Sequence, residues 1–165
     1  MVRPDIQILT IGGYGFDETT FASALVEAGV DTLVDIRRRR GLRGAKYSFL
    51  NSRRLQATLA TLGIDYRHLL DLAPSTELRA QQHLADLAAD TRKRDRSCLS
   101  ETFRRGYEVQ LRQGTGPASV VAAFGDDAQV VALFCVEQLP GACHRSILAD
   151  WLQGQTTTPV RHLVP

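Results

Sequence analysis

The first 70 residues alternate between short apolar runs and stretches that carry apolar side chains at helical spacing. The apolar runs at residues 6–11 and 32–36 predict strands, and residues 64–70 are a third strand candidate. Between them, helices are predicted to begin after Asp17 and Asn51, two residue types that cap helix N-termini. A strand–helix–strand–helix–strand order favours right-handed crossovers, so it predicts a parallel sheet.

The rest of the chain continues this pattern with a larger share of helix. Helices are expected over residues 75–90, 100–114, 117–125 and 143–152, and strands over residues 129–136 and 160–164. No internal repeat or linker interrupts the pattern. We therefore predict an α/β fold for residues 1–165, as a single compact domain with a mostly parallel sheet of about five strands flanked by helices.

Composition excludes several classes of protein. With 44% hydrophobic and 23% charged residues, the chain does not have the composition of a disordered tail, a collagen-like repeat or a coiled-coil rod. No apolar run approaches the ~18 residues that span a bilayer, and the first residues lack a signal-peptide core. Three cysteines, an odd number without an export signal, indicate a reducing compartment. We therefore expect a cytoplasmic protein with no membrane partner.

The basic residues are concentrated in one segment. The net charge is only +2, yet residues 37–54 contain eight basic residues and no acidic one. They are Arg37, Arg38, Arg39, Arg40, Arg43, Lys46, Arg53 and Arg54. The remaining chain has 12 basic and 18 acidic residues, so the basic loop 37–54 is a positive segment on an acidic body. Two interpretations stay open: arginines that bind phosphate, or a solvated loop whose arginines pair with the protein's own carboxylates.

Several chemically reactive residues follow predicted strands. Open parallel sheets bind ligands beyond the carboxyl ends of their strands, and four features are expected there. These features are Gly12-Gly13, Asp35 with Arg37, His68, and Cys135 with Glu137 on one strand face. The turn after the fourth strand then brings Cys143-His144-Arg145 to the start of a helix. The predicted topology therefore gathers one site.

The tripeptide Cys143-His144-Arg145 is the strongest candidate within that site. A helix N-terminus favours an anion or a thiolate, and an adjacent histidine titrates near neutral pH. Arg145 is able to hold a phosphate or carboxylate through two hydrogen bonds. Glu137 is a candidate acid or base, or a partner that neutralises Arg145. Cys135 by itself is interpreted as a small buried hydrophobe.

Residue spacing argues against several known chemistries. A Cys-x5-Arg phosphate loop needs arginine six residues after the nucleophile, where this chain has Gly141 and Ala149. Zinc binding is disfavoured because no Cys-x2-Cys pair occurs and Cys143 and His144 are adjacent. The dinucleotide fingerprint Gly-x-Gly-x-x-Gly and the Walker loop are both absent. We therefore predict no metal and no cofactor.

Two weaker signals are also open to interpretation. A Cys135–Cys143 disulfide is geometrically possible across one turn, but in a reducing compartment it would be at most a redox switch. His83 lies beside Leu84 and Leu87 on a predicted helix and is expected to be structural.

Residues 135–145, Cys-Val-Glu-Gln-Leu-Pro-Gly-Ala-Cys-His-Arg, resemble a known family. The chain is similar to the proteins grouped as domain of unknown function 488, which carry a strand ending in Cys-x-Glu followed by Cys-His-Arg. Further agreement lies in Thr10-Ile11-Gly12, Val34-Asp35-Ile36-Arg37 and Tyr66-Arg67-His68-Leu69. Family members often carry histidine at the position of Gly13 and a proline soon after Arg37, and this chain has neither. The resemblance implies a compact α/β fold and implies no reaction.

Our first hypothesis is an enzyme acting on a phosphate-bearing substrate, either a nucleotide or a nucleic acid (DNA or RNA). The expected anion ligands are Gly12, Gly13, Arg37 and Arg145, and a longer nucleic-acid backbone would follow Arg38, Arg39, Arg40, Arg43 and Lys46. Proton transfer is assigned to Glu137, Asp35 or His144. Cys143 is the nucleophile or a thiolate that stabilises charge.

Two alternatives belong to other functional classes. The protein is either a non-catalytic nucleic-acid-binding module that uses the basic loop 37–54, or a thiol redox or sulfur-transfer protein that uses its cysteines. The oligomeric state stays open.

Overall fold

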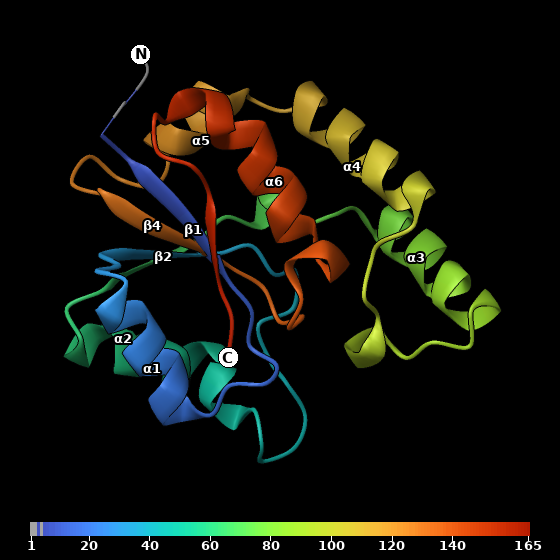
Figure 1. Ribbon diagram of the computed structural model, residues 1–165, viewed down its shortest axis with the longest axis horizontal. Coiled ribbons are helices and arrows are strands. Elements are labelled where there is room, and N and C mark those ends of the chain that lie inside the picture. Colours follow the sequence, from blue (N-terminus) through green and yellow to red (C-terminus); the bar gives the residue numbers. More distant parts are fainter. Residues whose placement is uncertain (1–2, 4) are drawn as a thin grey trace.

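One parallel sheet organises the molecule. The computed structural model describes residue 3 and residues 5–165, and its five strands lie in the order β3-β2-β4-β1-β5 (Figure 1). The strands are β1 (Gln7–Ile11), β2 (Thr32–Asp35), β3 (Asp65–His68), β4 (Val130–Phe134) and β5 (Arg161–Leu163). Every pairing in this sheet is parallel. The α/β fold class predicted from the sequence is therefore confirmed.

The strand order decides which chain segments meet at the carboxyl edge of the sheet. Although β1 and β2 are consecutive in sequence, β4 lies between them and pairs with both. Phe134 at the end of β4 is in register with Ile11 on one side and Asp35 on the other. The segments that follow β1, β2 and β4 therefore leave the sheet side by side.

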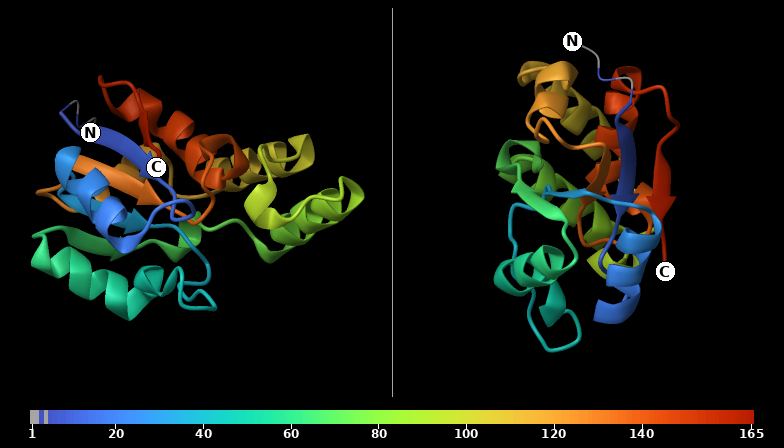
Figure 2. Two further views of the ribbon diagram at one scale, coloured as in Figure 1. Left: turned by 60° about the horizontal axis from the view of Figure 1, so that its bottom comes forward. Right: turned by 90° about the vertical axis from the view of Figure 1, so that its left-hand side faces the viewer.

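The helices cover both faces of the sheet (Figures 1 and 2). On one face lie α1 (Glu18–Glu27) and α2 (Ser52–Thr61), and on the other lie α4 (Glu101–Gln113), α5 (Pro117–Ala122) and α6 (His144–Leu152). The core is correspondingly divided into two hydrophobic clusters, with Ile8 in one and the next residue, Leu9, in the other. Burial on both faces explains why β1, β2 and β4 are mostly apolar, whereas the edge strands β3 and β5 are partly exposed and carry polar residues.

A helical hairpin projects past the carboxyl edge of the sheet. It consists of α3 (Thr76–Ala88) and α4, joined by a connector that holds a short 3-10 helix, Lys93–Asp95 (Figure 2). Gly106 allows the two helices to approach closely, because a Cβ there would lie 2.3 Å from Leu78 Cδ2. The hairpin forms a wall beside the strand ends.

The predicted helix caps are mostly confirmed. Asp17 and Thr20 form a reciprocal capping box, and Ser75 and Ser100 each accept a hydrogen bond from a helix amide. Asn51 is at the N-cap position of α2, but its side chain accepts from the Leu42 amide at 2.6 Å instead. Asn51 thus holds the basic loop 37–54 rather than the helix end.

The fourth strand is shorter than the sequence predicts. It ends at Phe134, so Cys135 and Glu137 lie on the loop after β4 and not on a strand face. Among the described residues, no helix has the length and apolar character needed to cross a membrane.

Candidate active site

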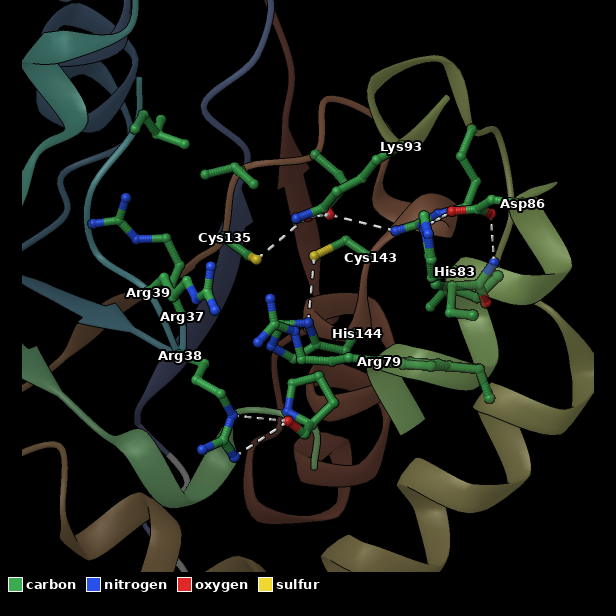
Figure 3. A pocket seen from close by; sticks show the side chains of 18 of the residues that line it. Arg37, Arg38, Arg39, Arg79, His83, Asp86, Lys93, Cys135, Cys143 and His144 are labelled. Carbon is green, nitrogen blue, oxygen red and sulfur yellow. Dashed lines mark hydrogen bonds and ion pairs between the residues drawn. The ribbon is translucent and has the colours of Figure 1, made fainter. Parts of the chain in front are cut away.

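A cavity of about 440 Å³ lies at the carboxyl edge of the sheet, between the strand ends and α3 (Figure 3). Its lining comes from the loop after β2, from α3, from the connector after α3, and from the loop after β4 with the start of α6. Six cationic side chains line it: Arg37, Arg38, Arg39, Arg79, Lys93 and Arg96. Only two carboxylates do so, Asp86 and Glu137. This excess of positive charge favours an anionic ligand.

Arg37 is held rigidly at the base of this cavity. Its Nε and Nη2 donate to Asp35 Oδ1 and Oδ2 at 2.9 and 2.8 Å, and its guanidinium lies 4.6 Å from the Phe134 ring centroid. The side chain is only 3% exposed, yet Nη1 has no hydrogen-bond partner among the described residues. A buried donor without a partner costs about 1–3 kcal/mol, and a ligand oxygen would remove that cost.

Asp35 is a positioning residue in this arrangement. It is fully buried and does not line the cavity. Besides the Arg37 side chain, the Arg37 backbone amide donates to Oδ1 at 3.1 Å, and the Tyr66 hydroxyl donates to Oδ2 at 2.7 Å. Both carboxylate oxygens are therefore engaged, which leaves Asp35 poorly placed for the proton transfer that the sequence suggested.

Cys135, Cys143 and His144 meet at one side of the cavity (Figure 3). One ligand atom from each of the three lies within 4.8 Å of the others, and all three residues are buried. Cys143 is the N-cap residue of α6, so its side chain lies at the positive end of that helix. The sequence placed Cys135 near this site, although by itself it was interpreted as a small buried hydrophobe.

A backbone carbonyl fixes the orientation of the His144 ring. His144 Nε2 lies 3.2 Å from the Ile36 carbonyl oxygen, which only accepts hydrogen bonds. Nε2 therefore carries the hydrogen, and in the neutral ring Nδ1 presents its lone pair to Cys143 Sγ at 3.8 Å. This is the arrangement of a Cys–His pair.

The two thiols differ strongly in acidity. Burial raises the pKa of Cys143, but a hydrogen bond from Cys135 and the positive charges of His144 and Arg145 outweigh it and lower that pKa well below its usual value. The hydrogen bond to Cys143, together with burial, raises the pKa of Cys135 well above its usual value. These opposite shifts favour the proton on Cys135 and the negative charge on Cys143.

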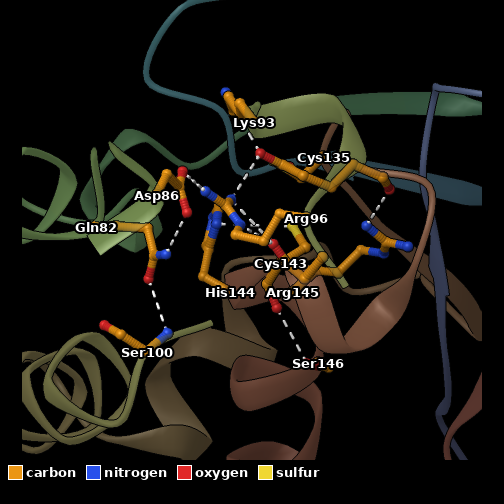
Figure 4. Close-up of polar contacts among 12 residues, drawn as sticks. Gln82, Asp86, Lys93, Arg96, Ser100, Cys135, Cys143, His144, Arg145 and Ser146 are labelled. Carbon is orange, nitrogen blue, oxygen red and sulfur yellow. Dashed lines mark hydrogen bonds and ion pairs between the residues drawn. The ribbon is translucent and has the colours of Figure 1, made fainter. Parts of the chain in front are cut away.

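Glu137 is bound into a network of ion pairs with Lys93 and Arg96, which are labelled in Figure 4. Its Oε1 lies 3.3 Å from Lys93 Nζ and 3.4 Å from Arg96 Nη2, and its Oε2 lies 3.3 Å from Cys135 Sγ. Burial opposes the charge on Lys93, but Glu137 raises the pKa of that ammonium overall. Glu137 thus faces the cavity as a paired carboxylate and holds two cations there.

Arg96 extends this network to α3. It forms an ion pair with Asp86 at 2.7 Å and donates to the Ala142 carbonyl, while Gln82 donates to Asp86 at 2.8 Å. Gln82 in turn accepts from the Ser100 amide (Figure 4). These contacts fasten the helical hairpin to the loop after β4.

Three expected anion ligands have other partners. Arg145 is fully buried and donates to the Glu137 and Gln138 carbonyls at 2.6 and 3.0 Å. A Cβ on Gly12 would lie 2.0 Å from the backbone carbonyl oxygen of Glu137, and the Gly13 amide donates to the Val136 carbonyl at 3.1 Å. None of Gly12, Gly13 and Arg145 lines the cavity. They support the loop that carries Cys135 and Glu137.

The basic loop 37–54 divides into two parts. Arg38 and Arg39 line the cavity with Arg37, and Arg38 also donates to the Pro74 carbonyl. Arg40 donates to Ser52 and Tyr66, and the hydrogen bond to Tyr66 raises the pKa of Arg40. Arg43 and Lys46 are exposed and do not line the cavity. The loop is therefore no uniform cationic track.

Sequence reasoning missed the contribution of α3 and its connector. Arg79, Gln82 and His83 line the cavity together with Asp86, Lys93 and Arg96. The expectation that His83 is structural is not supported by its place in this lining. A signal did exist in the helical pattern, because α3 buries the polar residues Gln82 and Asp86 and exposes Leu84 and Leu87. Polar residues on the inward face of a helix indicate a polar site there.

Comparison with known proteins gives one match. A family model described as "Domain of unknown function DUF488" matches residues 18–152, a span that includes the whole lining of the cavity. No curated protein and no solved structure matches the chain. On the family model, which spans most of its length, the chain belongs to the DUF488 family.

Proposed function

We propose that this protein is an enzyme that acts on a phosphate-bearing substrate and uses Cys143 as its nucleophile. The observation that carries the proposal is the buried, unpartnered Nη1 of Arg37 in a cavity lined by six cations. An anion with several oxygen acceptors satisfies that donor and the surrounding charge at once. Phosphate is the biological group that best matches this demand.

The cavity supplies phosphate ligands of two kinds. Arg37 is preorganised by Asp35, so binding costs little side-chain entropy. Arg39 is exposed at the rim, and no described residue forms a hydrogen bond or ion pair with its side chain. The substrate phosphate would therefore be held by the fixed Arg37 and enclosed by the mobile side chain of Arg39.

Cys143 is placed for nucleophilic attack on the bound substrate. His144 Nδ1 is the acceptor for the thiol proton, and the helix N-terminus and the Cys135 thiol stabilise the sulfur charge. In the step proposed, a bond forms from Sγ to the substrate phosphorus while the bond from phosphorus to the leaving oxygen breaks. The leaving oxygen departs with that electron pair and takes the proton held on His144 Nδ1. Water then cleaves the sulfur–phosphorus bond, releases phosphate and returns a proton to the Cys143–His144 pair. Glu137 contributes by holding Lys93 and Arg96 beside the developing charge.

A turnover screen with matched variants tests this function. Nucleoside phosphates, sugar phosphates and short oligonucleotides are incubated with the protein, and product release and intact protein mass are measured. We expect turnover or a covalent adduct that Cys143→Ser abolishes, whereas Cys98→Ser, at an exposed cysteine, leaves it unchanged. Equal rates in the Cys143→Ser and unsubstituted proteins would remove Cys143 from the mechanism.

The surrounding residues give a second test of the same proposal. Glu137→Gln should abolish turnover with the fold retained, since it releases Lys93 and Arg96 from their carboxylate. Arg39→Ala should raise KM, and Arg53→Ala, an exposed arginine outside the cavity lining, serves as its control. Similar effects of the two arginine substitutions would argue against binding in the cavity.

One observation favours the second candidate, a nucleic-acid-binding module. Arg43 and Lys46 are exposed outside the cavity, and the Lys46 ammonium lies 5.3 Å from the Tyr47 ring centroid. If these residues contact a nucleic-acid backbone, the double variant Arg43→Ala/Lys46→Ala should reduce the salt dependence of binding by about one unit per lost phosphate contact. The module is favoured if this variant weakens binding and Arg39→Ala does not.

A further inference from the structure

We propose that Cys135, Cys143 and His144 form a binding site for a thiophilic divalent metal ion, and that Zn²⁺ is the ion their chemistry fits. This inference goes beyond the proposed function and stands on the geometry of the three side chains. Their ligand atoms lie within 4.8 Å of one another, and all three residues are buried. Two thiolates and one imidazole are a donor set that zinc prefers.

The distances match a tetrahedral ion. With Zn–S bonds of about 2.3 Å and Zn–N bonds of about 2.0–2.1 Å, two neighbouring ligands of a tetrahedral site lie roughly 3.6 Å apart. Cys143 Sγ and His144 Nδ1 are separated by 3.8 Å. The two sulfurs lie within 4.8 Å of each other. Only small side-chain movements are needed to accept the ion.

The histidine is already oriented as a metal ligand. Metal-bound histidines usually donate their second ring N–H to a carbonyl or carboxylate, which fixes the tautomer and the ring. The Ile36 carbonyl receives that hydrogen bond from His144 Nε2. The Tyr107 ring packs edge-on against the imidazole at 5.3 Å between centroids and restricts its rotation. Nδ1 is thereby directed at the sulfurs.

A fourth ligand position is available on the cavity side. Because all three residues line the cavity, a water from the cavity is able to complete the coordination. On binding, Cys135 releases its proton to the buffer and Cys143 coordinates as a thiolate, so two thiolates neutralise the charge of the ion. The metal with its two thiolates therefore presents no net charge to the surrounding cations.

Metal binding at this site and nucleophilic catalysis by Cys143 would exclude each other. An ion bound to Cys143 occupies the sulfur electron pair that attacks the substrate. Zn²⁺ would consequently inhibit the proposed enzyme at the same sulfur, and a chelator would restore activity. Metal binding itself does not depend on that activity.

Spectroscopy without any substrate tests the site. The purified full chain, freed of metal with a chelator, is titrated with Co²⁺, and Zn²⁺ is then added in competition. We expect intense near-ultraviolet thiolate-to-cobalt charge transfer together with visible bands of tetrahedral Co²⁺, both removed by Zn²⁺. Cys135→Ser and His144→Gln should each weaken Zn²⁺ binding at least tenfold, while Cys98→Ser, at the exposed cysteine, should not. Circular dichroism checks that the variants fold.

Two results would overturn the site. One is Co²⁺ binding without charge transfer, and the other is unchanged Zn²⁺ affinity in folded Cys135→Ser and His144→Gln. X-ray absorption of the Zn²⁺-loaded wild-type protein avoids variants altogether: we expect two sulfur neighbours at about 2.3 Å, and a shell of only oxygen and nitrogen would contradict the proposal. Loss of the proposed enzyme function would leave these measurements unaffected.

Discussion

Two buried arginines, Arg37 after β2 and Arg145 in α6, are alike in burial and opposite in use. Their side chains are 3% and 0% exposed, and each has one nitrogen without a partner among the described residues. Arg37 pairs with the carboxylate of Asp35 and lines the cavity. Arg145 binds two backbone carbonyls beneath the loop after β4 and does not line it. Both arginines are buried, so their partners distinguish their roles: Arg37 is a candidate anion-binding residue, and Arg145 supports the loop after β4.

Arg145 also affects the site, although it does not line the cavity. No described carboxylate forms an ion pair with it, so its positive charge is not locally neutralised. That charge is one of the causes that lower the pKa of Cys143. Burial lowers the pKa of His162, and Arg145 adds to that effect. Arg145 therefore influences the sulfur through its field and through the loop it holds.

The largest expected effect is on stability at Arg37. Arg37→Met leaves the fully buried Asp35 carboxylate without its cation, so the free energy of unfolding should fall by about 3–5 kcal/mol. Urea denaturation measures this loss. The matched control is Arg54→Met, which breaks an exposed ion pair with Glu18 and should cost at most about 1 kcal/mol. A similar loss in both variants would contradict the role given to Asp35.

A smaller loss of stability is expected at Arg145. Arg145→Met leaves the Glu137 and Gln138 carbonyls without their donor, at about 1–3 kcal/mol in total, because removal of an unneutralised buried charge offsets part of the cost. Urea denaturation under the same conditions measures the loss in Arg145→Met, which is then compared with the loss in Arg37→Met. A loss greater than that of Arg37→Met would reverse the order proposed for the two arginines.

Substitutions of Arg37 and Arg145 should differ more in their effect on anion affinity than in their effect on the free energy of unfolding. Arg37→Lys keeps the charge but is unable to grip Asp35 with two nitrogens and still present a third, so affinity for inorganic phosphate should fall about tenfold, or ~1.4 kcal/mol. Titration calorimetry measures it. Arg145→Lys should change phosphate affinity less than twofold, and a tenfold loss there would show that Arg145 binds the anion.

The smallest expected effect concerns the orientation of Arg37. Tyr66→Phe removes the hydroxyl that donates to Asp35 Oδ2 at 2.7 Å, at a cost of about 1 kcal/mol in unfolding free energy. Phosphate affinity should fall slightly in the same variant, because Asp35 then holds Arg37 less firmly. If denaturation and calorimetry both match the unsubstituted protein, Tyr66 has no part in positioning Arg37.

Local signals in the sequence were sufficient for the elements of the fold. Apolar runs located β1, β2 and β4, and Asp17, Ser75 and Ser100 located helix starts, because these signals act between residues close in the chain. The edge strands β3 and β5 were also located, although both carry polar residues. The bounds were less well predicted. The apolar run at residues 129–136 extends past β4, since a buried loop is as apolar as a buried strand.

The sequence by itself determined a parallel α/β fold and the gathering of Arg37, Glu137, Cys143 and His144 at one edge of the sheet, because strand ends in such a fold share that edge. Only the tertiary structure decided that β4 lies between β1 and β2 and that α3 closes the cavity. It also directed Arg37 into the cavity and Arg145 away from it. Such directions depend on partners distant in sequence, namely the Tyr66 hydroxyl for Asp35 and the loop carbonyls for Arg145, which no local pattern encodes.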